Sequence, residues 1–429
     1  LTRSGRHHAA RLFLLAASFA FYAWWSFVYL LLLVGWMAAS YLIGEQIRAS
    51  RPVNPKAARR WMIAGVVMNL GLLGYFKYAT FIAGNIAALT GWDLAIGAVV
   101  LPLAISFHTF QQVAYLIDVS RAPSPRYTLI DYMLFIAFFP QLIAGPIVHH
   151  HELVPQLRDP KGFRIEWANV NAGLAFFIIG LAKKICLADP LSALAAPVFS
   201  GSALAPPSTG DAWAGTLAFS LGLYFDFSAY SDMAVGLARM FGVKLPYNFD
   251  SPYKSASIID FWRRWHMTLS RWLRDYLYIS LGGNRLGAGR RYLNLFATML
   301  LGGLWHGASW TFVAWGGLHG LFLIVNHGWN ALAARGRAPV LGRPLSVALT
   351  LASVVAAWVF FAAPSLEAAL GVLGSMAGFA DRAGGETTLG MLFSAGPQAA
   401  REAFGTQPVI ADAAIMLLAV LIVFGAPNS

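Results

Sequence analysis

Two histidines stand out as candidates for chemistry because each directly follows a tryptophan: His266 in "RRWHM" and His306 in "LWHGASW". A neutral imidazole accepts a proton near neutral pH, so histidine is the side chain most often used as a general base. A third histidine, His319, follows thirteen residues after His306 in the same glycine-rich stretch. Thirteen residues of continuous helix correspond to a rotation of about 220°, which turns the two side chains to opposite faces, whereas a break near Gly316 and Gly317 would weaken that geometry. We therefore expect His319 to be structural.

The chain that surrounds these histidines has the composition of a membrane protein. Hydrophobic residues make up 58% of it and charged residues 12%, and its mean hydropathy is +0.60. A hydrocarbon core of about 30 Å needs roughly 20 apolar residues per helix, and such runs recur along the whole chain. They are too long for barrel strands and lack period-two alternation, so the predicted fold class is all-α and polytopic. Helices are expected near 9–25, 27–45, 61–90, 97–118, 128–148, 168–190, 211–242, 291–327 (with a break), 344–363 and 409–426.

No composition shift separates a soluble domain from these runs, so residues 1–429 are predicted to form a single membrane-embedded domain. The chain starts without methionine and stops just after an apolar run, and we expect both ends to be trimmed. A helix that starts at the basic residues 289–291 carries His306 about 22 Å inward. Ionisable groups at that depth are costly and usually functional. Gly302, Gly303 and Gly307 predict either close helix packing or an unwound segment beside His306.

Residues 257–285 are too charged to span a membrane and too aromatic for a solvated helix. The pattern predicts one amphipathic helix that lies along the membrane boundary or against the helix bundle. Ion pairs Asp260–Arg264 and Arg271–Asp275 stand at helical spacing, and His266 stands at the border between its faces. Its apolar stripe covers an arc of about 80° and consists of Phe261, Trp265, Leu269, Trp272 and Tyr276. The alternative for His266 is a structural hydrogen bond to a carbonyl.

The net charge of +12 is spread over loops between apolar runs, which favours the positive-inside rule over nucleic-acid binding. One cytoplasmic loop is predicted at residues 48–60. Arg285, Arg290 and Arg291 mark another, which either binds the phosphates of a donor or is a plain cytoplasmic loop. The triple histidine at 149–151 is interpreted as a loop, because no acidic or cysteine cluster stands at metal-ligand spacing, so no metal site is predicted. Cys186 is the sole cysteine, which excludes an internal disulfide.

Residues 224–285, followed by "LLGGLWHGASWTFVAWGGLHG", strongly resemble the membrane-bound O-acyltransferase (MBOAT) family in its bacterial AlgI-like branch for polysaccharide O-acetylation. The resemblance extends upstream through "LPLAISFHTFQQVAYLIDV", "FIAFFPQLIAGPIVHHHELVPQL" and "GLAFFIIGLAKKICLADPL", and covers most of the chain.

The resemblance implies that His306 is the essential catalytic residue and His266 its frequent partner. It also implies an MBOAT-type ring of tilted helices around a central tunnel. Trp305 or unwound backbone amides are expected to stabilise an oxyanion. This sequence departs from the family where an arginine is expected after "WVFF" and Ala362 stands instead.

The implied reaction moves acetyl from cytoplasmic acetyl-CoA across the bacterial inner membrane, for O-acetylation of an extracytoplasmic polysaccharide such as alginate. The resemblance implies no bound cofactor, since acetyl-CoA is a substrate, and a periplasmic SGNH-type acetyltransferase as partner. Membrane lipids surround the chain, and no nucleic-acid partner is expected. The alternatives are D-alanyl transfer to teichoic acid, and a non-enzymatic transporter or channel with broken helices and a buried histidine.

Overall fold

The computed structural model describes residues 3–92, 94, 96–97, 99–143, 145–159, 166–201, 207–379 and 408–427. Every regular element within these ranges is a helix, which confirms the all-α prediction. The chain divides into two compact units, of which the first comprises Leu1–Ile179 with Tyr230–Tyr247 and the second Gly180–Ala229 with Asn248–Ser429. The single membrane-embedded domain and the ring of tilted helices around a central tunnel stay predictions.

Several helices have the length and composition of membrane spans. Within the described ranges there are four such stretches: Phe27–Ser50, Pro55–Thr90, Trp167–Ser200 and Arg343–Ala362. They overlap the predicted ranges 27–45, 61–90, 168–190 and 344–363. The chain is therefore a multi-pass membrane protein.

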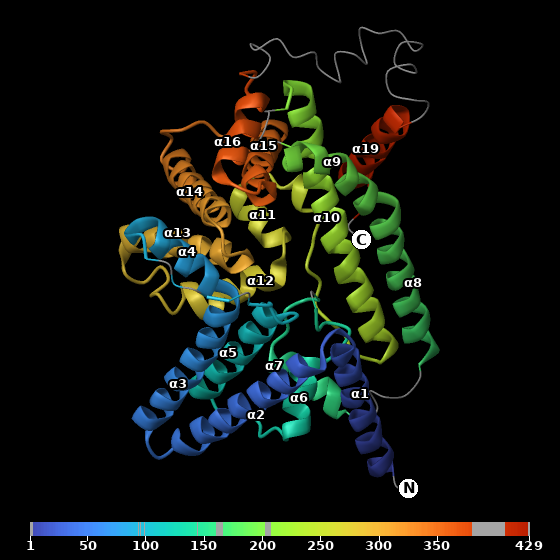
Figure 1. Ribbon diagram of the computed structural model, residues 1–429, viewed down its shortest axis with the longest axis vertical. Coiled ribbons are helices and arrows are strands. Elements are labelled where there is room, and N and C mark those ends of the chain that lie inside the picture. Colours follow the sequence, from blue (N-terminus) through green and yellow to red (C-terminus); the bar gives the residue numbers. More distant parts are fainter. Residues whose placement is uncertain are drawn as a thin grey trace. The chain divides into compact units, whose positions relative to one another are not determined.

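In the first unit, three helices pack side by side (Figure 1): α2, α3 and α5. Asn54 accepts a hydrogen bond from the amide of Ala57 and so caps the start of α3, where Pro55 occupies the first turn. The helices of this unit are α1 (Arg3–Trp25), α2 (Phe27–Ser50), α3 (Pro55–Leu73), α4 (Ala79–Thr90), α5 (Ile105–Arg121), α6 (Leu129–Ala137), α7 (His150–Arg158) and most of α8 (Trp167–Lys183). A π-helical turn, Gly74–Tyr78, joins α3 to α4.

Two helices of this unit are shorter than the sequence predicted. The range 97–118 becomes helical only at Ile105, and the range 128–148 forms only α6 before the chain turns at Pro140. Most of the irregular segment that follows α6 is nevertheless buried, and two of its polar groups donate hydrogen bonds within the protein. Gln141 Nε2 donates to the carbonyl of Phe135 over 3.0 Å, and the amide of Phe139 donates to Ser18 Oγ over 3.3 Å. Apolar composition alone did not reveal this break, because buried irregular backbone is as apolar as a span.

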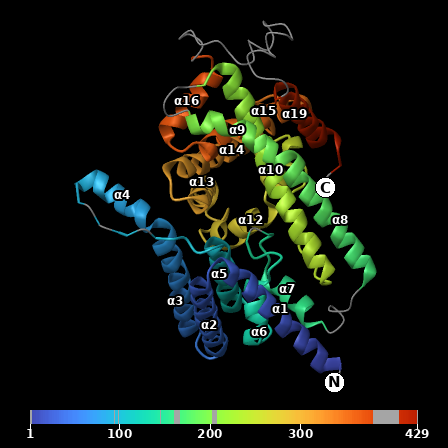
Figure 2. The same cartoon turned by 45° about the vertical axis from the view of Figure 1, so that its right-hand side comes forward.

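The second unit carries the predicted break near His306. The expected helix 291–327 is two helices, α13 (Gly287–His306) and α14 (Trp310–Ala333), separated by residues 307–309. The other helices of this unit are α9 (Asp189–Gly201), most of α10 (Thr209–Met240), α11 (Ile258–Arg264), α12 (Met267–Trp272), α15 (Arg343–Ala362), α16 (Leu366–Met376) and α19 (Pro408–Gly425). Shorter turns are Lys184–Ala188 and Leu273–Tyr278, which are π-helical, and Pro252–Lys254, which is 3-10. Figure 2 shows α13 and α14 next to each other.

Backbone-to-backbone packing at two glycines holds α13 against α14. A methyl group added at Gly303 would lie 2.9 Å from the Cα of Gly316 and would overlap the carbonyl oxygen of Phe312. A methyl group at Gly316 would lie 3.0 Å from the Cα of Gly303. The glycines therefore bring about the close packing that the sequence predicted, and the chain also unwinds directly after His306.

The Gly303→Ala substitution should lower the free energy of unfolding by about 1–3 kcal/mol, because neither backbone can move away without separating the helices. Gly317→Ala is the matched control. Its added methyl group would sit 3.6 Å from Leu300 Cδ1, an ordinary contact, and alanine gains up to about 1 kcal/mol of helix propensity. Thermal unfolding of both variants in the same detergent measures the difference. Equal melting temperatures for the two would contradict the packing argument.

The predicted amphipathic helix at 257–285 is not continuous. It ends at Arg264 and resumes at Met267, because His266 adopts a left-handed backbone with φ 42° and ψ 54°. The preceding loop holds the break open: the amide of Met267 donates to the Asn248 carbonyl over 2.9 Å, and the amide of Asp250 donates to the Arg264 carbonyl over 3.0 Å. The predicted apolar stripe is buried throughout despite the break.

One of the two predicted ion pairs of this segment is present. Arg264 Nε lies 2.9 Å from an oxygen of Asp260. Asp275 pairs with its neighbour Arg274 over 2.7 Å. The pairing of Arg271 with Asp275 stays a prediction.

Candidate active site

His306 is the last residue of α13, at the point where the chain unwinds before α14. Its imidazole is only partly buried, and it lies among aromatic rings from three helices. The ring centroids are 4.8 Å away for Trp305, 5.1 Å for Trp315 of α14 and 5.1 Å for Phe361 of α15. The imidazole is thus held among aromatic side chains and remains partly exposed at the end of α13.

His266 joins the same cluster from the break between α11 and α12. It is buried, its ring centroid lies 4.6 Å from that of Phe227 and 6.5 Å from that of Trp305, and its Nε2 has no hydrogen-bond partner. Burial lowers the pKa of His266 well below its usual range, and the nearby His306 lowers the pKa further. The imidazole is therefore neutral at neutral pH. Left-handed backbone at a non-glycine residue is characteristic of functional sites, where surrounding contacts hold it.

His319 lies closer to His306 than the sequence suggested. The prediction of opposite faces assumed a continuous helix, but the break at 307–309 turns α14 back along α13 and brings both histidines to Trp315. The ring centroid of Trp315 is 5.1 Å from that of His306 and 4.7 Å from that of His319. His319 is fully buried, and its Nδ1 lies 3.2 Å from the indole nitrogen of Trp262. Its burial favours the predicted structural role.

The two other positions singled out near the histidines are close to His306. Trp305 is buried and precedes His306 directly. Ala362, which replaces the expected arginine, is the last residue of α15 and follows Phe361, whose ring contacts His306. The methyl group of Ala362 packs against the separate apolar cluster that includes Val198 and Phe199.

The three arginines predicted to bind a donor lie at the opposite end of α13. Arg285 and Arg290 are exposed, while Arg291 is partly buried with its guanidinium 4.7 Å from the Tyr292 ring centre. At 1.5 Å per residue, Arg291 and His306 are separated by about 22 Å along the helix. Arg290 and Arg291 are the fourth and fifth residues of α13, whose first turn holds no acidic residue, so both cations lie near the positive end of the helix dipole. This unfavourable charge distribution suits the binding of an anion.

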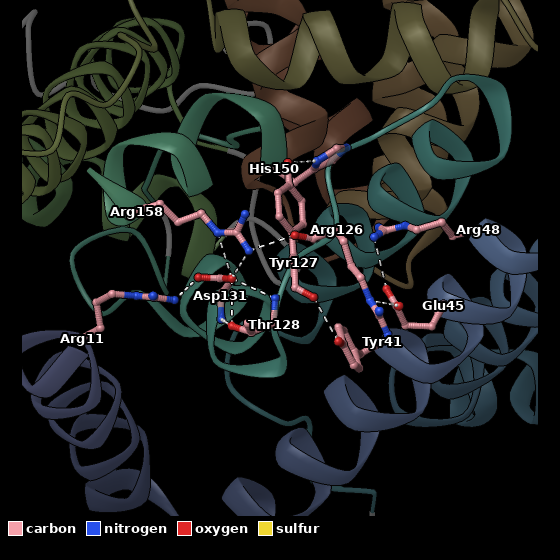
Figure 3. Close-up of polar contacts among 10 residues, drawn as sticks. All are labelled: Arg11, Tyr41, Glu45, Arg48, Arg126, Tyr127, Thr128, Asp131, His150 and Arg158. Atoms are coloured by element: carbon pink, nitrogen blue, oxygen red, sulfur yellow. Dashed lines mark hydrogen bonds and ion pairs between the residues drawn. The ribbon is translucent and has the colours of Figure 1, made fainter. Parts of the chain in front are cut away.

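A polar network in the first unit was not anticipated from the sequence (Figure 3). The carboxylate of Asp131 is fully buried and receives hydrogen bonds from Arg11, from Arg158 over 2.6 and 2.9 Å, and from the amide and hydroxyl of Thr128, each over 2.8 Å. Asp131 and Thr128 also form the capping box of α6. The spacing of Thr128 and Asp131 in "TLID" is that of a capping box and is visible in the sequence. The contacts with Arg11 and Arg158 are not, because these arginines belong to other helices.

The interpretation of the triple histidine as a loop without an acidic partner is wrong. His149 caps α7, and His150 and His151 are its first residues. Asp118, near the end of α5, lies beside them, and one ligand atom from each of Asp118, His150 and His151 falls within 4.8 Å of the others. Asp118 is 32 residues away from His150 in the sequence, so local spacing did not reveal the cluster.

Comparison with known proteins agrees with the resemblance read from the motifs. The sequence profile of the MBOAT, membrane-bound O-acyltransferase family, matches residues 119–340. The chain is 47% identical over 363 residues to a probable alginate O-acetylase AlgI of Pseudomonas aeruginosa, covering 83% of this chain and 68% of that protein. It is 42% identical to a peptidoglycan O-acetyltransferase of Helicobacter pylori, covering 86% and 74% of the two chains. A teichoic acid D-alanyltransferase of Streptococcus thermophilus is 30% identical, with 53% and 57% covered.

The matched region contains both tryptophan–histidine motifs, the break beside His306 and the basic start of α13. The helical fold, the apolar spans and these similarities agree with one another. The chain is a member of the membrane-bound O-acyltransferase family and is an O-acyltransferase.

Proposed function

We propose that this protein transfers acetyl from cytoplasmic acetyl-CoA across the bacterial inner membrane, for O-acetylation of an extracytoplasmic polysaccharide such as alginate. The observation that carries the proposal is the position of His306. It is the partly exposed histidine in a cluster where His266 and His319 are buried. Of the three imidazoles, it is the one that a substrate can reach.

His306 acts as the general base in this mechanism. Its neutral imidazole takes the proton of the acceptor hydroxyl while the hydroxyl oxygen attacks the thioester carbonyl carbon. Collapse of the tetrahedral intermediate breaks the carbon–sulfur bond, and the imidazolium returns the proton to the departing thiolate. The indole of Trp305 and the backbone amides of residues 307–309 are the proposed donors to the oxyanion. The neutral His266 tunes the reaction from its buried position.

The acceptor and the partner follow from the same proposal. Similarity to alginate and peptidoglycan acetylating proteins supports a polysaccharide as the final acceptor. The proposed partner is a periplasmic SGNH-type acetyltransferase, whose serine carries the acetyl group onward. D-alanyl transfer to teichoic acid is the second candidate, but the corresponding relatives match a smaller share of the chain at lower identity.

Purified protein should consume acetyl-CoA when an acceptor is present, and release of the free thiol measures the reaction. Substitution of Arg285, Arg290 and Arg291 together by glutamine should raise the KM for acetyl-CoA by 10-fold or more, since each charge-assisted hydrogen bond contributes about 1.5–3 kcal/mol. The turnover number should change little, because these residues lie at the end of α13 away from His306.

Two outcomes of this assay would count against the proposal. Absence of thiol release from acetyl-CoA, with release from a D-alanyl carrier thioester, would favour the second candidate. An unchanged KM in the triple variant would mean that the arginines form a plain cytoplasmic loop. Arg337→Gln serves as a control, because it removes an exposed positive charge from the turn after α14.

A further inference from the structure

We propose that Asp118, His150 and His151 bind a divalent transition metal ion of the Zn²⁺ type. None of these residues belongs to the candidate active site around His306. Asp118 lies in the last turn of α5, and the two histidines open α7. One ligand atom from each falls within 4.8 Å of the others.

His150 provides the strongest argument. Its side chain is 4% exposed, and its Nδ1 lies 3.0 Å from the hydroxyl of Tyr127 (Figure 3). Its Nε2 is buried, has no hydrogen-bond partner, and lies 3.3 Å from Asp118 Oδ2. A buried imidazole nitrogen without a partner is costly. A cation at this position gives Nε2 a partner and takes the carboxylate of Asp118 as a second ligand.

The separation of these two atoms fits a tetrahedral metal site. Zinc binds histidine nitrogen and carboxylate oxygen at about 2.0–2.2 Å, and two such ligands at the tetrahedral angle are about 3.4 Å apart. The observed 3.3 Å therefore corresponds to one edge of the tetrahedron. His151 is exposed, and rotation of its ring about the side-chain bonds, away from the stacked position beside His149, closes the remaining gap.

The surroundings orient the ligands in the manner of known metal sites. Metal-binding histidines usually engage their second ring nitrogen with a protein group, which fixes the ring and its tautomer. Tyr127 does this for His150, and its own position is fixed because its carbonyl accepts a hydrogen bond from Tyr41 over 3.0 Å. The ring of His149 stacks on that of His151 at 5.2 Å.

The donor set selects the class of metal. Two imidazole nitrogens and one carboxylate oxygen suit Zn²⁺ and neighbouring first-row ions, whereas Mg²⁺ and Ca²⁺ prefer oxygen ligands throughout. Because His151 is exposed, water completes the fourth position. The bound ion joins the end of α5 to the start of α7 and so stabilises the first unit.

The test uses the full-length protein purified without a polyhistidine tag. It is loaded with Zn²⁺, passed through gel filtration and analysed for metal content by mass spectrometry. We expect one retained equivalent for the wild type, with loss of that equivalent in His150→Gln and in His151→Gln. His151 is exposed, so its variant should fold normally even where a variant of the buried His150 does not. His8→Gln, a change at an exposed histidine of α1, should keep the metal.

A second measurement examines the hydroxyl of Tyr127. Tyr127→Phe keeps the ring and removes only the group that faces His150, so zinc affinity should fall about 10- to 100-fold. Co²⁺ substitution should give the visible absorption of a tetrahedral site in the wild type and not in His151→Gln. Wild-type protein without a retained equivalent, or His151→Gln with an undiminished one, would overturn the proposal.

Discussion

Replacement of His306 by alanine should reduce acetylation of the polymer by about 10²- to 10⁴-fold, the usual contribution of a general base. The imidazole is partly exposed at the end of α13, so its removal costs little packing, and the protein should remain folded. The decisive measurement is polymer acetylation in cells at matched levels of membrane protein. Thiol release from acetyl-CoA by the purified variant should fall in parallel.

The two neighbouring histidines provide the controls for this result. His319→Ala should unfold more readily, because it leaves a cavity against Trp315, but each folded molecule should retain substantial activity. His266→Ala should also leave measurable transfer, since we assign it a tuning role. Equal loss in the His306 and His319 variants would mean that a histidine pair performs the reaction. Substantial activity of His306→Ala would refute the assignment of the base.

Asp131→Asn should destabilise the first unit by about 3 kcal/mol. The change removes the negative charge that pairs with both guanidinium groups, those of Arg11 and Arg158. Loss of one partner of a buried ion pair typically costs about 3–5 kcal/mol. We expect the lower end, because 35% of the Arg158 side chain is exposed. Yield of folded protein and thermal unfolding in detergent measure the effect.

Arg126→Gln is the matched control for this prediction. Arg126 pairs with Glu45 over 3.1 Å in the same network, but its side chain is 80% exposed (Figure 3). Exposed ion pairs contribute at most about 1 kcal/mol. A loss of stability in Arg126→Gln as large as that in Asp131→Asn would show that burial does not determine the strength of these pairs.

The amino-acid sequence alone predicted the class of the protein and His306 as its candidate general base. Apolar runs long enough for a bilayer predict helices, because backbone groups in lipid must bond within their own segment. The tryptophan–histidine motifs and the glycines around His306 are local in sequence, and the glycines predicted either close helix packing or an unwound segment beside His306. The burial of the stripe that includes Phe261 and Trp265 followed from helical periodicity, which tolerates the break at His266.

Contacts between residues far apart in the chain account for what the sequence did not reveal. The break at His266 depends on hydrogen bonds from the loop at Asn248 and Asp250. The proximity of His319 to His306 depends on the reversal between α13 and α14. The Asp118–His150 pair depends on the tertiary arrangement that brings the end of α5 to the start of α7. Helical periodicity predicts which face of a helix is apolar. It does not predict which polar groups from distant parts of the chain will contact that helix. Tertiary packing brings Arg11 and Arg158 to Asp131, because a buried carboxylate is stable only where cations compensate its charge.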